Sequence, residues 1–333
     1  MNFKSALPIL LLIFNINFAG AQKHNAIPVI FDTDIAGDYD DVGAMALLHA
    51  FADKGEAKIL ATISCNAFET TAPTISVLNT YFGRPDIPIG IVKKNKPNKD
   101  CAQKWAQAII AGFPHHIKSN SQAIEAVALY RKILASQVDG SVTIISVGFF
   151  TNLADLLHSG ADKYSKLTGA QLVKKKVKNL VSMATGIGTD GKTFSEYNVN
   201  VDAASAQEVF KNWPTPITLS GFEIGEKILT GIRLINNYSI QNSPVKDAFQ
   251  IALAKDNNTV GRNSWDETAV LTAIRGPKPY FTYRKLNMEI KDDGTDVVIP
   301  GERFLYLQFA MEPDAIAKDI EQLMMHQPAK KMK

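Results

Sequence analysis

Five carboxylates crowd into ten residues near the start of the chain, and these side chains are the ones most able to do chemistry. They are Asp32, Asp34, Asp38, Asp40 and Asp41. An apolar run at residues 27–31 precedes them, and small and apolar residues at helical spacing follow them. The pattern predicts a buried strand, a tight loop at Ala36 and Gly37, and a helix that holds the last two acids in its first turn.

Such a cluster is electrostatically unfavourable if the carboxylates converge. Two like charges about 4 Å apart repel by roughly 4 kcal/mol at an effective dielectric constant near 20. A helix N-terminus offsets only about 0.3–1 kcal/mol per anion, so solvent, protonation or a bound cation must meet the remainder. Helix capping and a solvated loop would explain one or two acids. Five acids at the carboxyl end of a strand, where open α/β sheets bind ligands, favour a cation site.

The spacing Asp-Thr-Asp-x-x-x-Asp-x-Asp-Asp before a helix resembles the opening signature of the nucleoside hydrolase (nucleoside N-ribohydrolase) family. It matches the longer-loop form found in bacterial members, which has two extra residues before the Asp pair. Further segments resemble the family in the same chain order, and the likeness runs from about residue 27 to 275. They are Asn66 after a second strand, Phe150-Thr-Asn-Leu153, Met183-x-x-Gly186 followed by Glu196-Tyr-Asn198, and Asp266 at the start of a late helix.

The resemblance implies a Ca²⁺ site built from both ends of the chain. Its ligands would be the carboxylates of Asp34, Asp41 and Asp266 and the backbone carbonyl of Val147. Oxygen ligands of this kind suit Ca²⁺, which takes about six to eight of them. Asp32 is expected to brace the loop from behind the ligands, whereas Asp38 is either a substitute ligand or an exposed residue.

The resemblance also implies the reaction, which is hydrolysis of the N-glycosidic bond of a ribonucleoside to ribose and free base, as in purine and pyrimidine salvage. Asp40 would be the general base that activates water, and Asn198 would favour the cationic transition state of the sugar. The substrate contacts would come from Asn66, Met183, Glu196, Asn198 and Trp265. Glu196 and Asn198 are two residues apart, so an extended segment would place both side chains on one face.

One position departs from the family pattern. Well-studied members carry a His immediately before the late Asp, where it can protonate the leaving base, and this chain has Trp265 there. An indole can stack on a base but is not an acid at neutral pH. Either another group protonates the base, with His115, His116 and Tyr238 as candidates, or the substrate has a better leaving group.

Strand-like and helix-like segments alternate from residue 27 to about 220. Strands are expected at 57–63, 87–92, 142–147, 177–183 and 217–219, and helices at 72–82, 102–111, 122–136, 152–157 and 203–212. The alternation predicts a single α/β domain with a mostly parallel, Rossmann-like central sheet and helices on both faces. The last third is expected to add helices at 244–255 and 267–275, an edge hairpin at 286–290 and 303–309, and a closing helix at 311–325.

Chain length, composition and the N-terminal segment indicate the size of the domain and its location. The 333 residues, 46% of them hydrophobic, suffice for one large domain. Residues 1–21 are expected to be a signal peptide, with Lys4, an apolar run at 6–18 and the small residues 19–21 before the cleavage point. The run is short for a permanent membrane span, so the mature domain, 22–333, is expected to be secreted, to a periplasm or beyond, and free of the membrane.

The sequence also bears on binding partners and on the state of the two cysteines. The net charge of +3 gives no reason to expect a nucleic-acid partner, and the resemblance implies a homodimer or homotetramer. Cys65 and Cys101 either form one disulfide in an oxidising compartment or stay as buried thiols.

Two other classes of protein fit parts of the pattern. In a phosphatase of the haloacid dehalogenase type, Asp32 would be a nucleophile and Asp32→Asn would block phosphate release. In an exported nucleoside-binding protein, the same cleft would hold a nucleoside without cleaving it.

Overall fold

The computed structural model describes residues 26–92, 97–188 and 190–328, so the expected signal peptide at 1–21 lies outside the described residues. The strands are β1 (Ile27–Thr33), β2 (Ala57–Ser64), β3 (Ile89–Ile91), β4 (Ile124–Glu125), β5 (Val142–Ser146), β6 (Val177–Met183), β7 (Ile217–Ser220), β8 (Leu229–Thr230), β9 (Arg262–Asn263), β10 (Phe281–Ile290) and β11 (Asp296–Phe309). Nine of them form one sheet, in the order β10-β11-β7-β6-β5-β1-β2-β3-β4, and β8 and β9 form a separate antiparallel pair.

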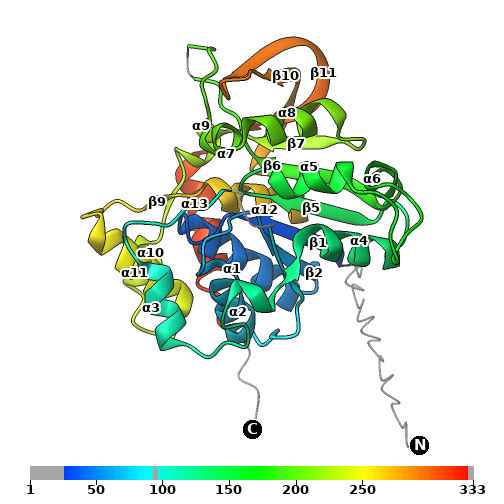
Figure 1. The fold of residues 1–333 in the computed structure, drawn as a ribbon. Coiled ribbons are helices and arrows are strands. Elements are labelled where there is room, and N and C mark those ends of the chain that lie inside the picture. The colour runs from blue at the N-terminus through cyan, green and yellow to red at the C-terminus, as the bar shows by residue number, and fades with distance from the viewer. Residues whose placement is uncertain (1–25, 93–96, 189, 329–333) are drawn as a thin grey trace, which may run out of the picture.

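Every neighbouring pair in the large sheet is parallel except β10 and β11. The predicted, mostly parallel sheet with an edge hairpin is therefore confirmed, although the hairpin strands are longer than expected. β11 also pairs in parallel with β7 and so extends the sheet. The acid-bearing strand β1 lies between β2 and β5, near the centre of the sheet (Figure 1).

Helices cover both faces of the sheet, as predicted. They are α1 (Asp40–Asp53), α2 (Thr71–Tyr81), α3 (Trp105–Gly112), η1 (Asn120–Gln122), α4 (Ala126–Ser136), α5 (Thr151–His158), α6 (Gly169–Lys176), α7 (Tyr197–Val201), α8 (Ala203–Asn212), α9 (Phe222–Gly225), α10 (Ile232–Ile235), α11 (Pro244–Lys255), α12 (Trp265–Arg275) and α13 (Pro313–Met324). β1 alternates between two cores: Val29 and Phe31 pack into the one beneath α1 and α12, and Ile30 packs into the one beneath α4 and α5.

Element boundaries differ from the predictions where a side chain decides the end. The helix expected over 122–136 begins only at Ala126, because the Glu125 carboxylate accepts the backbone N–H of Ala128 at 2.8 Å and caps it there. Cys65 and Cys101 are both buried free thiols, which settles the alternative left open by the sequence. Within the described part of the chain, no helix has the length and apolarity needed to cross a bilayer.

Candidate active site

The end of β1 and the start of α1 position the acidic cluster. β1 ends at Thr33, Asp34 follows, and the chain turns through Ala36, whose φ of 79° lies in the left-handed region. The backbone N–H of Gly37 closes the turn on the Asp34 carbonyl at 3.2 Å. α1 then begins at Asp40, as predicted, so Asp40 and Asp41 occupy its positively polarised end.

A second helix brings a carboxylate from the far end of the chain. α12 packs against α1 and begins at Trp265, so Asp266 sits in its first turn. Ligand oxygens of Asp40, Asp41 and Asp266 all lie within 4.8 Å of one another, and all three residues are buried. Asp266 therefore lies beside the N-terminal acids, as predicted, but the group within 4.8 Å contains Asp40 in place of Asp34.

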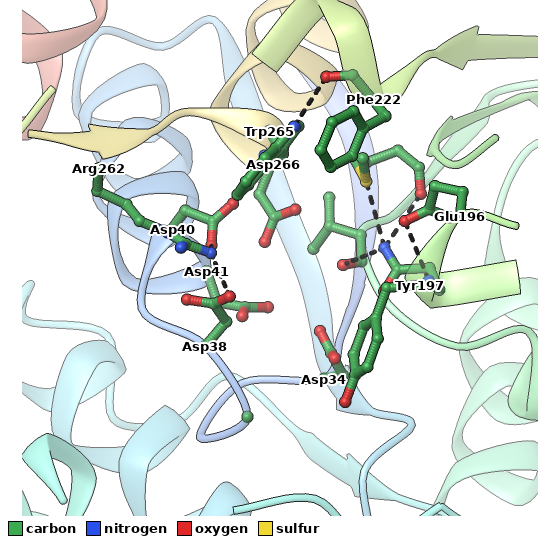
Figure 2. A pocket seen from close by; sticks show the side chains of 14 residues that line it. Asp34, Asp38, Asp40, Asp41, Glu196, Tyr197, Phe222, Arg262, Trp265 and Asp266 are labelled. Carbon is green, nitrogen blue, oxygen red and sulfur yellow. Dashed lines mark hydrogen bonds and ion pairs between the residues drawn. The ribbon is translucent and has the colours of Figure 1, made fainter. Parts of the chain in front are cut away.

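Neighbouring strand ends add further groups to the same cavity. Because β1, β5 and β6 are adjacent and parallel, Asp34, Val147 and Met183 reach the same edge of the sheet. They line a cavity of about 270 Å³ together with the carboxylate group (Figure 2). That volume is just below the roughly 300–1,000 Å³ found for small-molecule sites.

The protein itself does little to stabilise the negative charge of these carboxylates. Burial raises the pKa of Asp41 well above its usual range, and the charges of Asp34 and Asp40 raise it further. Burial and neighbouring carboxylates act in the same direction on the pKa of Asp34 and Asp266. A cation among these groups would favour their charged forms.

The donor set fits a hard divalent cation. Thr33 donates a hydrogen bond to Oδ1 of Asp41, but the buried Oδ2 of Asp41 has no partner among the described residues. Carboxylate oxygens and a backbone carbonyl are the ligands that such ions take. A buried, unpaired carboxylate oxygen beside two other carboxylates is therefore consistent with a metal site.

The opposite wall carries the two polar residues expected to hold a sugar. Glu196 and Asn198 both line the cavity, but the extended segment predicted for them is wrong, since α7 begins at Tyr197. The Glu196 carboxylate caps this helix by accepting the N–H groups of Asn198 at 3.0 Å and Val199 at 3.2 Å. Burial raises the pKa of Glu196 to about 7, and these hydrogen bonds oppose the rise.

Asn198 is directed at the backbone of the central strands. Its amide nitrogen donates to the carbonyl of Met183 at 3.3 Å and to that of Val147 at 3.4 Å. The carbonyl predicted to bind the metal is therefore in contact with the residue predicted to stabilise the sugar, and both residues line the cavity.

A third wall consists of aromatic rings and one guanidinium. The Trp265 indole lies between Phe222, whose ring centroid is 5.0 Å away, and Arg262, whose Cζ is 4.8 Å from the indole centroid (Figure 2). The indole N–H donates to the Phe222 carbonyl at 2.8 Å, so Trp265 offers the cavity apolar surface and no free donor.

Arg262, Phe222 and Tyr197 line the cavity but were not among the predicted site residues. Arg262 donates from Nη2 to Asp38 and, at 3.1 Å, to Asp40. Burial opposes its charge, but the carboxylates of Asp40 and Asp38 outweigh that effect and raise its pKa. The one sequence signal that could have indicated Arg262 was the excess of acids near the N-terminus, because buried carboxylates need a positive group from elsewhere in the chain.

Two predicted residues lie behind the cavity wall. Asp32 is fully buried and accepts hydrogen bonds from Tyr130 at 2.7 Å and from Asn152. Because it does not line the cavity, it cannot meet a substrate as a phosphatase nucleophile would.

Asn66 also departs from its predicted place. Its side-chain nitrogen donates to the carbonyls of Asp34 and Lys99, and its side-chain oxygen accepts the N–H groups of Phe68 and Lys99. Backbone groups therefore occupy both the nitrogen and the oxygen of this amide. It is fully buried and absent from the cavity wall, where a ribose contact was expected. His115, His116 and Tyr238, considered as proton donors, do not line the cavity either.

The fold and site together define an α/β protein that gathers buried carboxylates at the carboxyl edge of a parallel sheet, opposite sugar-compatible polar groups. Comparison with known proteins identifies it further. Residues 29–307 match the family model described as inosine-uridine preferring nucleoside hydrolase, so the chain belongs to that family and is a nucleoside N-ribohydrolase family enzyme.

Individual relatives agree with this assignment. The chain is 26% identical over 227 residues to the pyrimidine-specific ribonucleoside hydrolase RihA of Escherichia coli O81, a match covering 66% of this chain and 68% of the relative. Among solved structures, an inosine-guanosine nucleoside hydrolase shares the fold with a TM-score of 0.70 at 18% identity, covering 91% of this chain and 99% of that one. The inosine-uridine preferring nucleoside hydrolase of Bacillus anthracis aligns with a TM-score of 0.67 at 16% identity, covering 90% and 99%.

Proposed function

We propose that this enzyme hydrolyses the N-glycosidic bond of ribonucleosides with the help of Ca²⁺, and releases ribose and the free base. The observation that supports this most directly is the group formed by Asp40, Asp41 and Asp266, whose oxygens lie within 4.8 Å of one another. It faces Glu196 and Asn198 across one cavity. A divalent ion and a sugar could thus be held side by side.

Asp41 and Asp266 of this group would hold the ion together with Asp34 and the Val147 carbonyl, which line the same cavity, and Asp40 would be left free for the attacking water. When bound, it would supply positive charge that orients the ribose hydroxyls and the attacking water.

The chain's own residues supply the rest of the reaction. Asp40 would take a proton from the attacking water; its carboxylate is held by Arg262 at 3.1 Å and by the N–H of Asp266 at 3.4 Å, which fixes its orientation. Glu196 would accept hydrogen bonds from the ribose hydroxyls. Asn198 would favour the cationic sugar through its oxygen, since its nitrogen already donates to two carbonyls.

The base would then lie against the remaining wall, formed by Phe222, Trp265 and Arg262. Aromatic side chains there suit the flat faces of purines and pyrimidines. The named relatives act on either pyrimidine or purine nucleosides, so the substrate panel must contain both.

We also propose that residues 1–21 direct export and that the mature enzyme acts in a periplasm or outside the cell, as a homodimer or homotetramer. The charged start, apolar run and small residues before Gln22 support export. The family resemblance supports the oligomer.

A reducing-sugar assay over uridine, cytidine, inosine and guanosine tests the function. We expect release of ribose that stops when a chelator removes the metal and returns with Ca²⁺. Asp41→Asn should fold but lose at least about 1,000-fold in rate, because it removes a ligand charge at the centre of the site. Nucleoside binding without sugar release would contradict hydrolysis and favour a binding protein.

A further inference from the structure

Among the described residues, the base-facing wall of the cavity contains one cation. Of the 14 residues that line the cavity, six are acids and one, Arg262, is basic; none is histidine. The Arg262 side chain is 18% exposed and stacks between aromatic groups, with its Cζ 5.0 Å from the Tyr39 centroid and 4.8 Å from that of Trp265. The guanidinium is therefore held in one plane beside the cavity.

Part of this guanidinium is not used by the protein. Its two hydrogen bonds, to Asp38 and Asp40, both start from Nη2. Nη1 takes part in neither of these two bonds, and Nε is buried without a partner among the described residues. A guanidinium has five N–H donors, so donors remain for a ligand that enters the cavity.

Cleavage of the N-glycosidic bond creates a need for such a donor. The bond's electron pair goes to the ring nitrogen of the base, which carries negative charge unless it is protonated. Trp265 cannot help, because its N–H is bound to the Phe222 carbonyl at 2.8 Å. A fixed cation with free N–H groups can stabilise charge that develops as the base departs.

We propose that Arg262 is a catalytic residue that stabilises the departing base as an anion, in place of a proton donor; the inference rests on the proposed hydrolysis. The C1′–N bond breaks, water oxygen bonds to C1′, and the water proton goes to Asp40. The base anion leaves with its electron pair hydrogen-bonded to the guanidinium and takes a proton from solvent afterwards. Asp38, which lies in the longer form of the acidic loop, and Asp40 hold the guanidinium from its other side by accepting hydrogen bonds from Nη2.

A comparison of two leaving groups tests this role. In Arg262→Gln, we expect the rate on a cleavable natural nucleoside to fall about 100- to 1,000-fold, the usual effect of removing one donor to a developing anion. The rate on 4-nitrophenyl β-D-ribofuranoside should fall by less than about tenfold, because 4-nitrophenolate is stable without help. Arg262→Lys should fall between the wild type and Arg262→Gln, since it keeps the charge but not the planar donor set.

The control is Arg275→Gln, at the far end of α12, where Arg275 pairs with Glu56 on the surface at 2.9 Å. It should leave both rates unchanged, and thermal unfolding should show that every variant is folded.

Three results would overturn the role of Arg262. Equal losses on both substrates would mean that Arg262 only positions Asp40, and no loss on the nucleoside would mean that it does nothing. A wild type that cleaves the 4-nitrophenyl riboside but no nucleoside would also contradict leaving-base assistance while keeping the ribosyl hydrolase chemistry. A wild type that cleaves neither substrate would instead contradict the proposed function itself.

Discussion

Glu196 combines a structural role with a place on the cavity wall, where we propose that it binds ribose. Its carboxylate accepts backbone N–H groups from the first turn of α7 and from Thr185, at 3.0–3.3 Å, while the residue still lines the cavity. A carboxylate oxygen has more than one lone pair. Glu196 can therefore cap the helix and accept a ribose hydroxyl at the same time.

Substitutions at this residue should separate the two tasks. Glu196→Gln keeps one oxygen for the N–H groups of Val199 and Thr185, but its NH2 group would face the N–H of Asn198 and the charge is lost. We therefore expect a stability between those of the wild type and Glu196→Ala, and a raised KM for ribonucleosides. Glu196→Ala also removes the cap and should lower the free energy of unfolding by about 0.5–2 kcal/mol. Steady-state kinetics and thermal unfolding measure these effects. Equal stability of the Ala and Gln variants would contradict the capping role.

At the scale of elements, the site depends on how closely α1 and α12 approach. Gly43 on α1 faces Glu267 on α12, and a Cβ at position 43 would collide with Oε1 of Glu267 and lie 2.9 Å from its Cδ. Glu267 is fully buried, and neither of its carboxylate oxygens has a partner among the described residues. The missing side chain at Gly43 lets Asp41 and Asp266 come together.

Gly43→Ala should therefore push the two helices apart. We expect a loss of about 1–3 kcal/mol in the free energy of unfolding, the usual effect of overpacking, together with weaker Ca²⁺ binding by calorimetry. Gly112→Ala is the matched control, because a Cβ there meets nothing within 4 Å. Adding Glu267→Ala to Gly43→Ala should restore stability; a double variant no more stable than the single one would contradict the collision.

At the scale of the whole molecule, long-range contacts between buried acids and backbone hold the cavity together. Asp296 at the start of β11 accepts the N–H of Gly186, in the loop after β6, at 2.8 Å. Burial first, and then the charge of Glu196, raises the pKa of Asp296 to about 8 from an ordinary value of 3.8. Glu196 has a pKa of about 7 for the same main reason.

These shifts set the direction of a pH effect on stability. Both carboxyls hold their protons more tightly in the folded chain than in the unfolded one, so their contribution is complete below about pH 4 and is lost as the pH rises through about 7 to 8. The metal-free enzyme should thus have a lower Tm at about pH 8 than at about pH 5.5. Asp296→Asn, which cannot ionise, should reduce this fall; an unchanged pH profile in that variant would contradict the assignment.

Much of the fold could be predicted, because hydrophobic residues recur at clear strand or helix spacing along this chain. The strand over 177–183 and the helices over 203–212 and 244–255 have the predicted bounds. Short elements such as α7 and α9 were missed, since four or five residues carry too little pattern. Their ends depend on single side chains, as Glu196 shows.

The sequence by itself determined that carboxylates gather after the first strand, from Asp32 to Asp41, and it predicted Asp266 as their late partner, because local spacing and order along the chain are visible in it. Only the tertiary structure decided that Arg262 joins this loop and that Asn66 turns away to bind backbone carbonyls. The reason is physical: Arg262 lies 222 residues from Asp40 in the chain, and only packing brings them together. No local pattern records which distant cation will neutralise a buried carboxylate.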